Sequence, residues 1–446
     1  MRKYFGTDGV RGIAGEFLTF ELAEAIGYAL GKTLAEEGKT NSRVIIGTDT
    51  RESRIFLKDA IAKGLYKSGS SAYDIGVVST PAVAYLTKKH GYDAGVMISA
   101  SHNSYEYNGI KIFGSDGFKL TDEEEEHIED IIAEGKVPAA ECENYLAEEP
   151  SMKHEYAEYL KGYISADYDG IRAVIDCANG SAYATAKEIF DGSGIEAEYI
   201  GCEPDGVNIN KGCGSTKLSL LREKVLASGA DVGLAFDGDA DRFLAIDEKG
   251  NEVDGDFVLA ILSLALREEG KLNHDAVVGT VMSNYGFNKF ASDNGLKFVA
   301  TKVGDRYVLE EMLKEDYSLG GEQSGHVIIK EAATTGDGQL TAIYLMNRLA
   351  KTKKSLSELA SVMTKYPQHM VNVSADADGK RAFKEDARIT GIIADAEKKL
   401  GTTGRILVRP SGTEPVVRIM VESMDAELTV SLCEDVASKI KNILNA

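Results

Sequence analysis

The sequence Ala94-Gly95-Val96-Met97-Ile98-Ser99-Ala100-Ser101-His102-Asn103 joins an apolar run to a polar turn. We expect residues 94–98 to form a buried strand that ends just before the two serines. α/β enzymes carry reactive groups outside the carboxyl ends of such strands. The stretch therefore predicts an α/β fold with a serine hydroxyl exposed at a strand end, next to a histidine and an asparagine.

Short β-branched runs and longer helical patterns alternate along most of the chain. The runs predict strands at residues 43–46, 94–98, 172–176, 231–236, 276–281 and 297–303, and the helical spacing predicts helices at 20–36, 54–68 and 256–269. This alternation is typical of mixed α/β layers with mostly parallel strands. Because the pattern restarts near residue 170 and near residue 275, it predicts several similar α/β domains.

The length of 446 residues is compatible with several domains. An acidic passage closes the first pattern, and Tyr366-Pro367-Gln368 precedes a shorter passage with its own strands and helices. We therefore expect four domains, at residues 1–150, 151–252, 253–366 and 367–446. Three of them should be similar mixed α/β domains, and the last should be a smaller α+β domain.

The composition argues against several classes of function. The formal net charge of −21 disfavours broad binding to nucleic acids or anionic membranes. The five cysteines form no Cys-x-x-Cys pair, which disfavours zinc and a disulfide framework. No apolar run approaches the roughly 18 residues of a membrane span, and the first residues contain no apolar signal core. These features predict a cytoplasmic protein, and they leave open an anionic small substrate held by local arginines.

The segment Asp237-Gly238-Asp239-Ala240-Asp241-Arg242 follows the expected strand at 231–236. Carboxylates at alternate positions can converge in a tight loop, and oxygen ligands without histidine or cysteine suit Mg²⁺ or Ca²⁺. An EF-hand is excluded because Arg242 stands where its loop needs glycine and because the flanking residues predict strands. An acidic turn without a metal stays open, although clustered carboxylates repel one another. Three protein ligands leave room for a phosphate oxygen, which Arg242 could also contact.

A second loop, Arg409-Pro410-Ser411-Gly412-Thr413-Glu414-Pro415, joins two apolar runs and is followed by Arg418. Gly412 allows a tight turn whose N–H groups point inward, and the hydroxyls and the two arginines add further donors for an anion. The segment therefore predicts a phosphate site, with a plain hairpin turn as the alternative.

A third loop, Gly320-Gly321-Glu322-Gln323-Ser324-Gly325-His326, combines a flexible backbone with a carboxylate, an amide, a hydroxyl and an imidazole. These groups suit neighbouring sugar hydroxyls, although a glycine-rich structural turn fits equally well. Two further loops, Gly6 to Gly12 and Gly47 to Arg51, place Arg11 and Arg51 near the first sheet. Either arginine could bind phosphate or pair with a neighbouring aspartate.

Taken together, these segments resemble the α-D-phosphohexomutase superfamily. Ser-Ala-Ser-His-Asn, Asp-Gly-Asp-x-Asp-Arg, Gly-Glu-x-Ser-Gly-His and Ser-Gly-Thr-Glu-Pro occur in the order and at separations that fit that family. Further segments resemble its branch that acts on glucosamine phosphates: residues 3–12, 204–210, 213–216, 303–308 and 366–368, with Gln323 in the third loop. The resemblance covers essentially the whole chain and implies a four-domain molecule with its active site in a central cleft.

The resemblance also implies a role for each loop. Ser101, rather than Ser99, would be the phosphorylated serine, and its phosphate would bind Mg²⁺ together with Asp237, Asp239 and Asp241. The implied catalytic residues are Ser101, Arg11, His102, Lys111 and Arg242. The implied sugar-binding residues are Glu322, Ser324 and His326, and the implied phosphate-binding residues are Arg409, Ser411, Gly412, Thr413 and Arg418.

The implied reaction is an isomerisation that converts glucosamine 6-phosphate to glucosamine 1-phosphate for UDP-N-acetylglucosamine synthesis. The phosphoserine would give its phosphoryl group to the sugar, forming glucosamine 1,6-bisphosphate, and would recover the other phosphoryl group after the intermediate has turned over. A serine phosphate carries about −1.5 to −2 charges, so a cation is needed to admit a second phosphate. The family also leads us to expect a homodimer.

Two departures from the family and three alternatives remain. Ser104 stands where the family usually has proline, and Ala240 replaces a glycine that is common in the glucosamine branch. A phosphoglucomutase or phosphomannomutase would share the chemistry but recognise other hydroxyls. A phosphatase would use a loop aspartate as nucleophile instead of Ser101. A sugar-phosphate sensor would bind without turnover.

Overall fold

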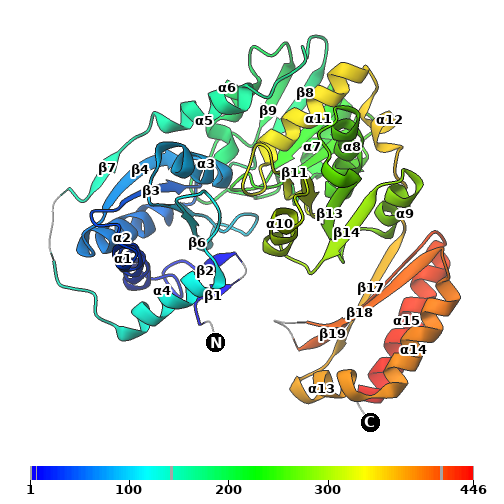
Figure 1. Ribbon diagram of the computed structural model, residues 1–446. Helices are drawn as coiled ribbons and strands as arrows, with labels where there is room; N and C mark the ends of the chain where they lie inside the picture. Colours follow the sequence, from blue (N-terminus) through cyan, green and yellow to red (C-terminus); the bar gives the residue numbers. More distant parts are fainter. Residues whose placement is uncertain (1–2, 7, 141–143, 412–414, 445–446) are drawn as a thin grey trace. The chain divides into compact units, whose positions relative to one another are not determined.

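The computed structural model of the protein describes residues 3–6, 8–140, 144–411 and 415–444. Four sheets follow one another along these residues, and helices pack against them (Figure 1). By its internal contacts the chain divides into two compact units. One unit consists of Met1–Met282 with Leu296–Val362, and the other of Ser283–Gly295 with Met363–Ala446.

The first sheet has seven strands in the order β1-β2-β6-β5-β3-β4-β7. They are β1 (Phe5–Gly6), β2 (Gly9–Ile13), β3 (Arg43–Thr48), β4 (Ser71–Val77), β5 (Ala94–Ile98), β6 (Tyr107–Gly114) and β7 (Leu146–Glu148). The strands from β5 to β7 in this order are parallel, and β6, β2 and β1 continue the sheet antiparallel. Every residue of β5 is buried, as expected of a strand that helices cover on both faces.

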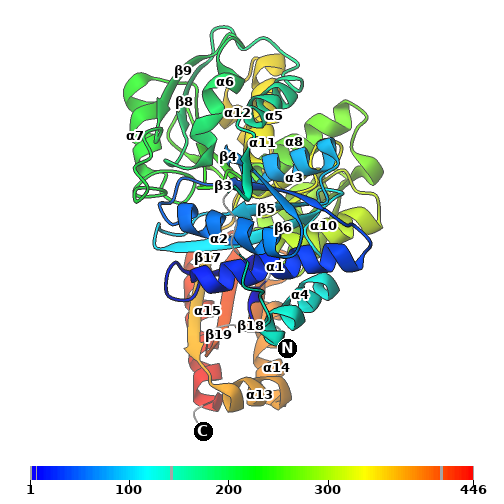
Figure 2. The ribbon, with the colours of Figure 1, turned by 90° about the vertical axis from the view of Figure 1, so that its left-hand side faces the viewer.

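Alternate residues of these strands meet different helices. The helices are α1 (Phe20–Glu36), α2 (Arg54–Lys67), α3 (Thr80–His90) and α4 (Asp122–Glu134). Val44 and Val96 join the core formed with α1 and α2. On the other face, Gly47 and Gly95 leave space for Val83 of α3. Figure 2 shows α1 and α2 lying against each other.

The second sheet has the order β12-β11-β10-β8-β9. Its strands are β8 (Arg172–Asp176), β9 (Glu196–Ile200), β10 (Val232–Phe236), β11 (Phe243–Asp247) and β12 (Glu252–Val253), accompanied by α5 (Met152–Lys161), the 3-10 turn η1 (Ser181–Ala184), α6 (Ala186–Phe190) and α7 (Ser219–Ser228). Strands β10, β8 and β9 are parallel, and β11 and β12 are antiparallel additions. The acidic loop lies between β10 and β11.

The third sheet has the order β14-β13-β15-β16. Its strands are β13 (Ala276–Thr280), β14 (Lys297–Thr301), β15 (Leu319–Gly321) and β16 (Val327–Ile329), accompanied by α8 (Gly255–Glu268), η2 (Asn273–Asp275), α10 (Asp305–Lys314), α11 (Gly338–Thr352) and α12 (Leu356–Ala360). Strands β14, β13 and β15 are parallel, and β16 returns antiparallel after the loop that was expected to bind sugar.

The second unit contains an antiparallel sheet in the order β17-β19-β18. Its elements are β17 (Gln368–Ser374), β18 (Gly404–Pro410), β19 (Val416–Ser423), α9 (Tyr285–Asp293), α13 (Ala377–Glu385), α14 (Ala387–Leu400) and α15 (Ala426–Leu444). Side chains from the sheet, α14 and α15 form its core. Although α9 precedes β14 in the sequence, Asn284 at its N-terminus donates to Glu422 of β19 at 3.1 Å, which ties α9 to this unit.

The α/β class, with three α/β layers and a distinct C-terminal sheet, is confirmed. Each of the first three sheets is mixed, because antiparallel strands extend its parallel part. The predicted helix at 20–36 and the strands at 94–98 and 172–176 have the predicted limits, and the other predicted elements differ by one or two residues at their ends. Among the residues that the structure describes, no helix has both the length and the apolar character needed to cross a bilayer. The domain limits stay a prediction.

Candidate active site

Ser101 lies at the end of β5, in the turn that the sequence predicted. Its side chain is buried, and its Oγ donates a hydrogen bond to Oδ2 of Asp237 at 2.5 Å. The backbone of Ser101 is left-handed, with φ of 52°, which is uncommon for a residue other than glycine. Such strained residues often mark functional sites. The turn therefore directs the serine hydroxyl at the acidic loop of the second sheet.

The three aspartates of the acidic loop converge, as the sequence predicted. One oxygen from each of Asp237, Asp239 and Asp241 lies within 4.8 Å of the others, and all three residues are buried. Oδ1 of Asp239 and Oδ1 of Asp241 are buried without a hydrogen-bond partner in the described part of the chain. Buried carboxylate oxygens that lack donors repel one another unless a cation lies between them. The loop therefore fits a divalent cation that prefers oxygen ligands.

Lys111 of β6 provides positive charge at the same loop. Its Nζ lies 2.9 Å from Asp239 Oδ2, 3.3 Å from Asp241 Oδ2 and 3.0 Å from Asp8 Oδ2. Burial would lower the pKa of Lys111, but Asp239, Asp8 and Asp241 outweigh it and raise that pKa well above its usual value. Arg11 also binds Asp8, at 2.7 Å. Both predicted basic residues thus belong to one charged cluster beside the aspartates.

His102 and Arg242 flank Ser101. Burial, and then the charges of Arg242 and Arg11, lower the pKa of His102 to about 4, so its ring is neutral at pH 7. Its Nδ1 lies 3.4 Å from Ser101 Oγ. The backbone N–H of Arg242 donates to Asp237 at 3.2 Å, and its buried side-chain Nε lies 3.9 Å from Asp241 Oδ1 and makes no hydrogen bond within the described residues. These groups suit an anion next to Ser101.

The predicted sugar loop adjoins the acidic loop. The backbone N–H of Phe243, which follows the acidic loop, donates to Gly325 at 3.0 Å. His326 contacts Asp241, with Nδ1 3.6 Å from Oδ2, and its Nε2 accepts from the N–H of Gly336 at 3.0 Å. Glu322 accepts from the N–H of Gly304 at 3.1 Å, and the buried Oγ of Ser324 has no partner in the residues described. His326 is thus tied to the acidic loop, while Ser324 keeps a donor available.

Sequence reasoning missed Lys119 and Asp305. Lys119 bonds Asp8 at 2.5 Å and also forms an ion pair with Asp305, whose Oδ2 lies 3.7 Å from His326 Nε2. Lys119, Asp305 and His326 line a cavity of about 660 Å³ between the β6–α4 segment and α10. Asp305 lies in the segment 303–308 that carried part of the resemblance, but a lone aspartate after a strand gives no sign of its partners.

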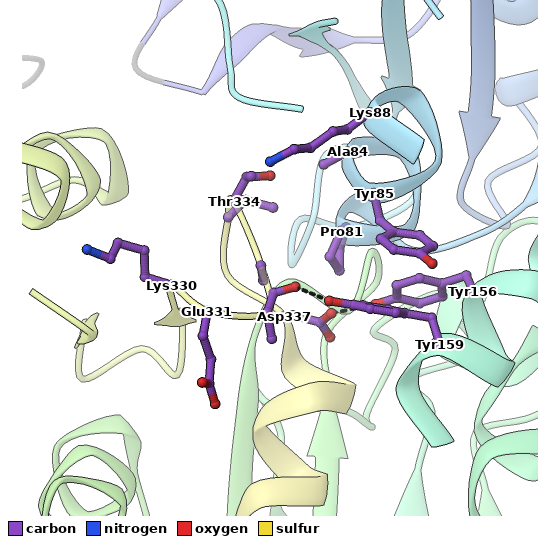
Figure 3. Close-up of a pocket in the computed structure, with 13 residues that line it drawn as sticks. Pro81, Ala84, Tyr85, Lys88, Tyr156, Tyr159, Lys330, Glu331, Thr334 and Asp337 are labelled. Carbon is purple, nitrogen blue, oxygen red and sulfur yellow. Dashed lines mark hydrogen bonds between the residues drawn. The ribbon is translucent and has the colours of Figure 1, made fainter. Parts of the chain in front are cut away.

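A second cavity, of about 210 Å³, lies between α3, α5 and the segment that joins β16 to α11 (Figure 3). Tyr85 of α3 stacks on Tyr159 of α5 with ring centroids 4.0 Å apart. Tyr156 donates to Asp337 at 2.5 Å, and Asp337 caps α11 by accepting from the N–H of Leu340 at 2.9 Å. Burial raises the pKa of Asp337 to about 6 against these two hydrogen bonds. Asp337 directly follows Gly336, whose N–H donates to His326, so this cluster adjoins the residue that contacts the histidine.

The predicted phosphate loop lies in the second unit, at the turn between β18 and β19. Arg409 and Arg418 are direct cross-strand partners, so their side chains leave the sheet on the same face. Ser411 begins the turn, with its N–H donating to Val416 at 2.8 Å. Gly412 and Thr413 lie outside the described residues. Like charges directly opposite each other are unfavourable in a sheet, so this arrangement suits a bound anion.

Models of the phosphoglucomutase/phosphomannomutase family match the chain in four parts. They are α/β/α domain I at residues 2–138, domain II at 154–250, domain III at 254–366 and the C-terminal domain at 370–439. The phosphoglucosamine mutases of Caldicellulosiruptor bescii and Caldicellulosiruptor saccharolyticus are each 48% identical over 450 residues, covering 100% of both chains. A phosphoglucomutase/phosphomannomutase family protein from Burkholderia thailandensis superposes with a TM-score of 0.83 at 22% identity, covering 100% of this chain and 98% of that one. The resemblance noted in the sequence is thereby confirmed, and the chain belongs to the phosphoglucomutase/phosphomannomutase family and, within it, to the phosphoglucosamine mutases.

Proposed function

We propose that the protein is a mutase that interconverts glucosamine 6-phosphate and glucosamine 1-phosphate through a phosphorylated Ser101 and glucosamine 1,6-bisphosphate. The observation that carries the proposal is the contact of Ser101 Oγ with Asp237 at 2.5 Å, in a buried loop that also holds Asp239 and Asp241. A hydroxyl alone among carboxylates is a poor nucleophile. A phosphorylated serine beside a cation bound there is a suitable phosphoryl donor.

The transfer balances within the site. In the first step the bond between Ser101 Oγ and phosphorus breaks, phosphorus bonds to the free hydroxyl oxygen of the sugar, and the proton of that hydroxyl ends on Ser101 Oγ. In the second step the other phosphoryl group of the bisphosphate leaves its sugar oxygen and bonds to Ser101 Oγ, and the serine proton ends on that sugar oxygen. Arg11, which binds Asp8, and Lys111, which binds Asp8 and the acidic loop, would stabilise the negative charge during both transfers.

The acidic loop would hold Mg²⁺ through Asp237, Asp239, Asp241 and an oxygen of the serine phosphate. When bound, Mg²⁺ would polarise the transferring phosphoryl group. His102 is neutral and contacts Ser101, so it adds no charge to repel Lys111 or Arg242. Arg242 has an unused donor for the same phosphate.

The sugar and its second phosphate would be held by the remaining loops. Glu322 and Ser324 would offer an acceptor and a hydroxyl donor to the sugar hydroxyls, and His326, the third predicted sugar-binding residue, would hold this loop in place because its ring nitrogens face Asp241 and Gly336. Arg409 and Arg418, with Ser411, Gly412 and Thr413, would bind the phosphate that does not react. The preference for an amino sugar is supported by the phosphoglucosamine mutase relatives and not by any contact of Gln323, which donates to Asp254 at 3.2 Å. We also expect a cytoplasmic homodimer that binds neither nucleic acid nor membranes.

The proposal is tested by ³¹P NMR of the protein with Mg²⁺, a trace of glucosamine 1,6-bisphosphate, and the 6-phosphate of glucosamine, glucose or mannose. We expect glucosamine 6-phosphate to be converted first and the conversion to be lost in Ser101→Ala. Ser151→Ala is a matched control, because Ser151 is exposed and makes no side-chain cap bond at α5.

The other results of this experiment each point to one alternative. Faster conversion of glucose or mannose phosphate would mean that the protein is a phosphoglucomutase or a phosphomannomutase. Release of inorganic phosphate that survives Ser101→Ala would identify a phosphatase. Binding of glucosamine 6-phosphate without any turnover would identify a sensor.

A further inference from the structure

Arg51 is the largest fully buried side chain in the described part of the molecule. It follows β3, and the sequence left open whether it binds phosphate or pairs with its neighbour. Burying a guanidinium costs several kcal/mol unless it is paired and its donors are used. Its side chain is 0% exposed. A guanidinium buried this deeply needs an acceptor for each of its N–H donors.

All five N–H donors of Arg51 are used within the first sheet's layer. Nε donates to Asp49 Oδ2 at 2.8 Å. One Nη donates to the carbonyl of Tyr107 at 2.9 Å and to that of Ser104. The other Nη donates to the carbonyls of Ser101 and Asn103, at 2.9 Å and 2.8 Å. Four of the five bonds therefore end on backbone oxygens of the loop that begins at Ser101.

Asp49, the ion-pair partner of Arg51, is linked through Ser99 to the backbone N–H of Ser101. Asp49 Oδ2 accepts from Ser99 Oγ at 2.6 Å, and Ser99 Oγ accepts from the N–H of Ser101 at 2.9 Å. The peptide groups on both sides of Ser101 are thus fixed from one buried ion pair. This explains how the loop keeps the left-handed φ of 52° at Ser101.

Asn210, from the segment that follows β9, binds the same loop from the second sheet's side. Its Nδ2 donates to the carbonyl of Ser101 at 2.9 Å and to that of Asn103 at 3.0 Å. Each of these two oxygens therefore accepts from Arg51 and from Asn210, which uses both of its lone pairs. The two side chains approach from different layers and leave the loop little freedom.

We infer that Arg51, with Asn210, positions Ser101 for phosphoryl transfer by fixing the carbonyls of residues 101–107. This inference rests on the proposed function, because it assigns these residues a role in delivering the same serine. Neither side chain reaches the reacting atoms. They act through the backbone, by keeping Ser101 Oγ directed at the acidic loop during both transfers, when the serine is phosphorylated and when it is free.

Lysine cannot replace Arg51 in this role. An ammonium has three donors around one nitrogen, whereas the five bonds of Arg51 need a planar fork that spans several peptide groups. A shift of the reacting atoms by about 1 Å can cost about a hundredfold in rate. We therefore expect kcat of Arg51→Lys to fall about a hundredfold, with KM for the sugar phosphate changed by less than about threefold.

The test compares four proteins in the same assay: wild type, Arg51→Lys, Asn210→Ala and Arg43→Lys. Arg43 is the matched control because it also donates to backbone carbonyls, those of His90 and Gly91, but at an exposed site away from the serine loop. Each kcat is measured at saturating glucosamine 1,6-bisphosphate and is divided by the fraction of folded molecules, measured by hydrogen exchange of the intact protein. This division removes any loss that comes only from unfolded molecules.

The inference predicts a large fall in normalised kcat for Arg51→Lys, about a tenfold fall for Asn210→Ala, and an unchanged value for Arg43→Lys. Normalised kcat at the wild-type level in Arg51→Lys would overturn it. If Arg51→Lys does not fold, the test rests on Asn210→Ala. A wild-type kcat in Asn210→Ala would overturn the inference that Arg51 and Asn210 together position Ser101. Absence of turnover by the wild-type protein would instead contradict the proposed function, so the two failures are distinguishable.

Discussion

In the region around Ser101, positive side chains contact negative ones, whereas at the β18–β19 turn two arginines lie directly opposite each other. Lys111 lies within 3.3 Å of oxygens of Asp8, Asp239 and Asp241. Arg409 and Arg418 are cross-strand partners. The first region pairs its charges with opposite charges, while the second places two positive charges side by side on one face of a sheet. Removing one charge should therefore destabilise the first region and leave the second unharmed until its ligand is added.

Asp239→Asn should have the largest effect. The change keeps the shape of the side chain but removes one charge from the predicted metal site and from Lys111. We expect turnover to fall on the order of a thousandfold, as with loss of a preorganised electrostatic group. The measurement is turnover at saturating Mg²⁺, together with Mg²⁺ affinity by calorimetry.

Asp169→Asn is the control for this change, because Asp169 is an exposed aspartate of the same charge. It should keep both turnover and Mg²⁺ affinity. If Asp239→Asn binds Mg²⁺ and turns over as the wild type does, the acidic loop is only a partner for Lys111 and the metal site is wrong.

Arg405→Gln should have the next largest effect, on stability. Arg405 lies on β18 opposite Glu422, with Nε 2.6 Å from Oε2, and Glu422 is fully buried. Removing one member of such a pair leaves an uncompensated buried charge, which costs about 3 kcal/mol. Urea unfolding of the variant should show this loss. An unchanged midpoint would mean that Asn284 and the N–H of Tyr285, which also bond Glu422, satisfy it alone.

Arg409→Gln, four residues along the same strand, should behave oppositely. It removes one of two like charges, so the free energy of unfolding without ligand should change by less than about 0.5 kcal/mol. A charge-assisted hydrogen bond to phosphate is worth about 1.5–3 kcal/mol, so KM for the sugar phosphate should rise about ten- to a hundredfold with kcat nearly unchanged. Steady-state kinetics beside the unfolding curves separate the two effects. A variant that is destabilised but has normal KM would contradict the assignment of this turn to phosphate.

The two regions also differ in how much of them the sequence could predict. Local patterns identified Ser101, the three aspartates and the arginine turn, because each is a short run of chemically distinctive residues beside a strand. Arg51 was seen but left undecided between phosphate and Asp49. Its four carbonyl partners belong to a loop about fifty residues later, and backbone oxygens carry no side-chain signature. Long-range partners such as Lys119 and Asp305, or the placement of α9 with β19, depend on packing that no local pattern encodes.

Substitution of Asp337 should give the smallest effect. It tests whether neighbouring cations decide in which direction the pKa of a carboxyl group shifts in the first unit. Burial raises the pKa of Asp8 less than Lys111 and Lys119 lower it, so that pKa ends below its usual value. Asp337 is 2% exposed, against 25% for the side chain of Asp8, and it is held by Tyr156 and a backbone N–H, with its pKa raised to about 6. Between its unfolded and folded pKa values, folded Asp337 keeps a proton that the unfolded chain has lost. Stability from this group is therefore present at low pH and is lost as pH rises through about 6.

Relative to Asp337→Asn, which can still cap α11, the wild type should gain about 1 kcal/mol in free energy of unfolding when the pH falls from about 7 to about 5. Urea unfolding of both proteins at the two pH values measures this double difference, in which the other titrating groups cancel. Tyr156→Phe should enlarge it, because losing the donated hydrogen bond raises the pKa of Asp337 further. A double difference near zero would mean that hydrogen bonds alone hold Asp337 ionised, and the contrast with Asp8 would then not depend on the lysines.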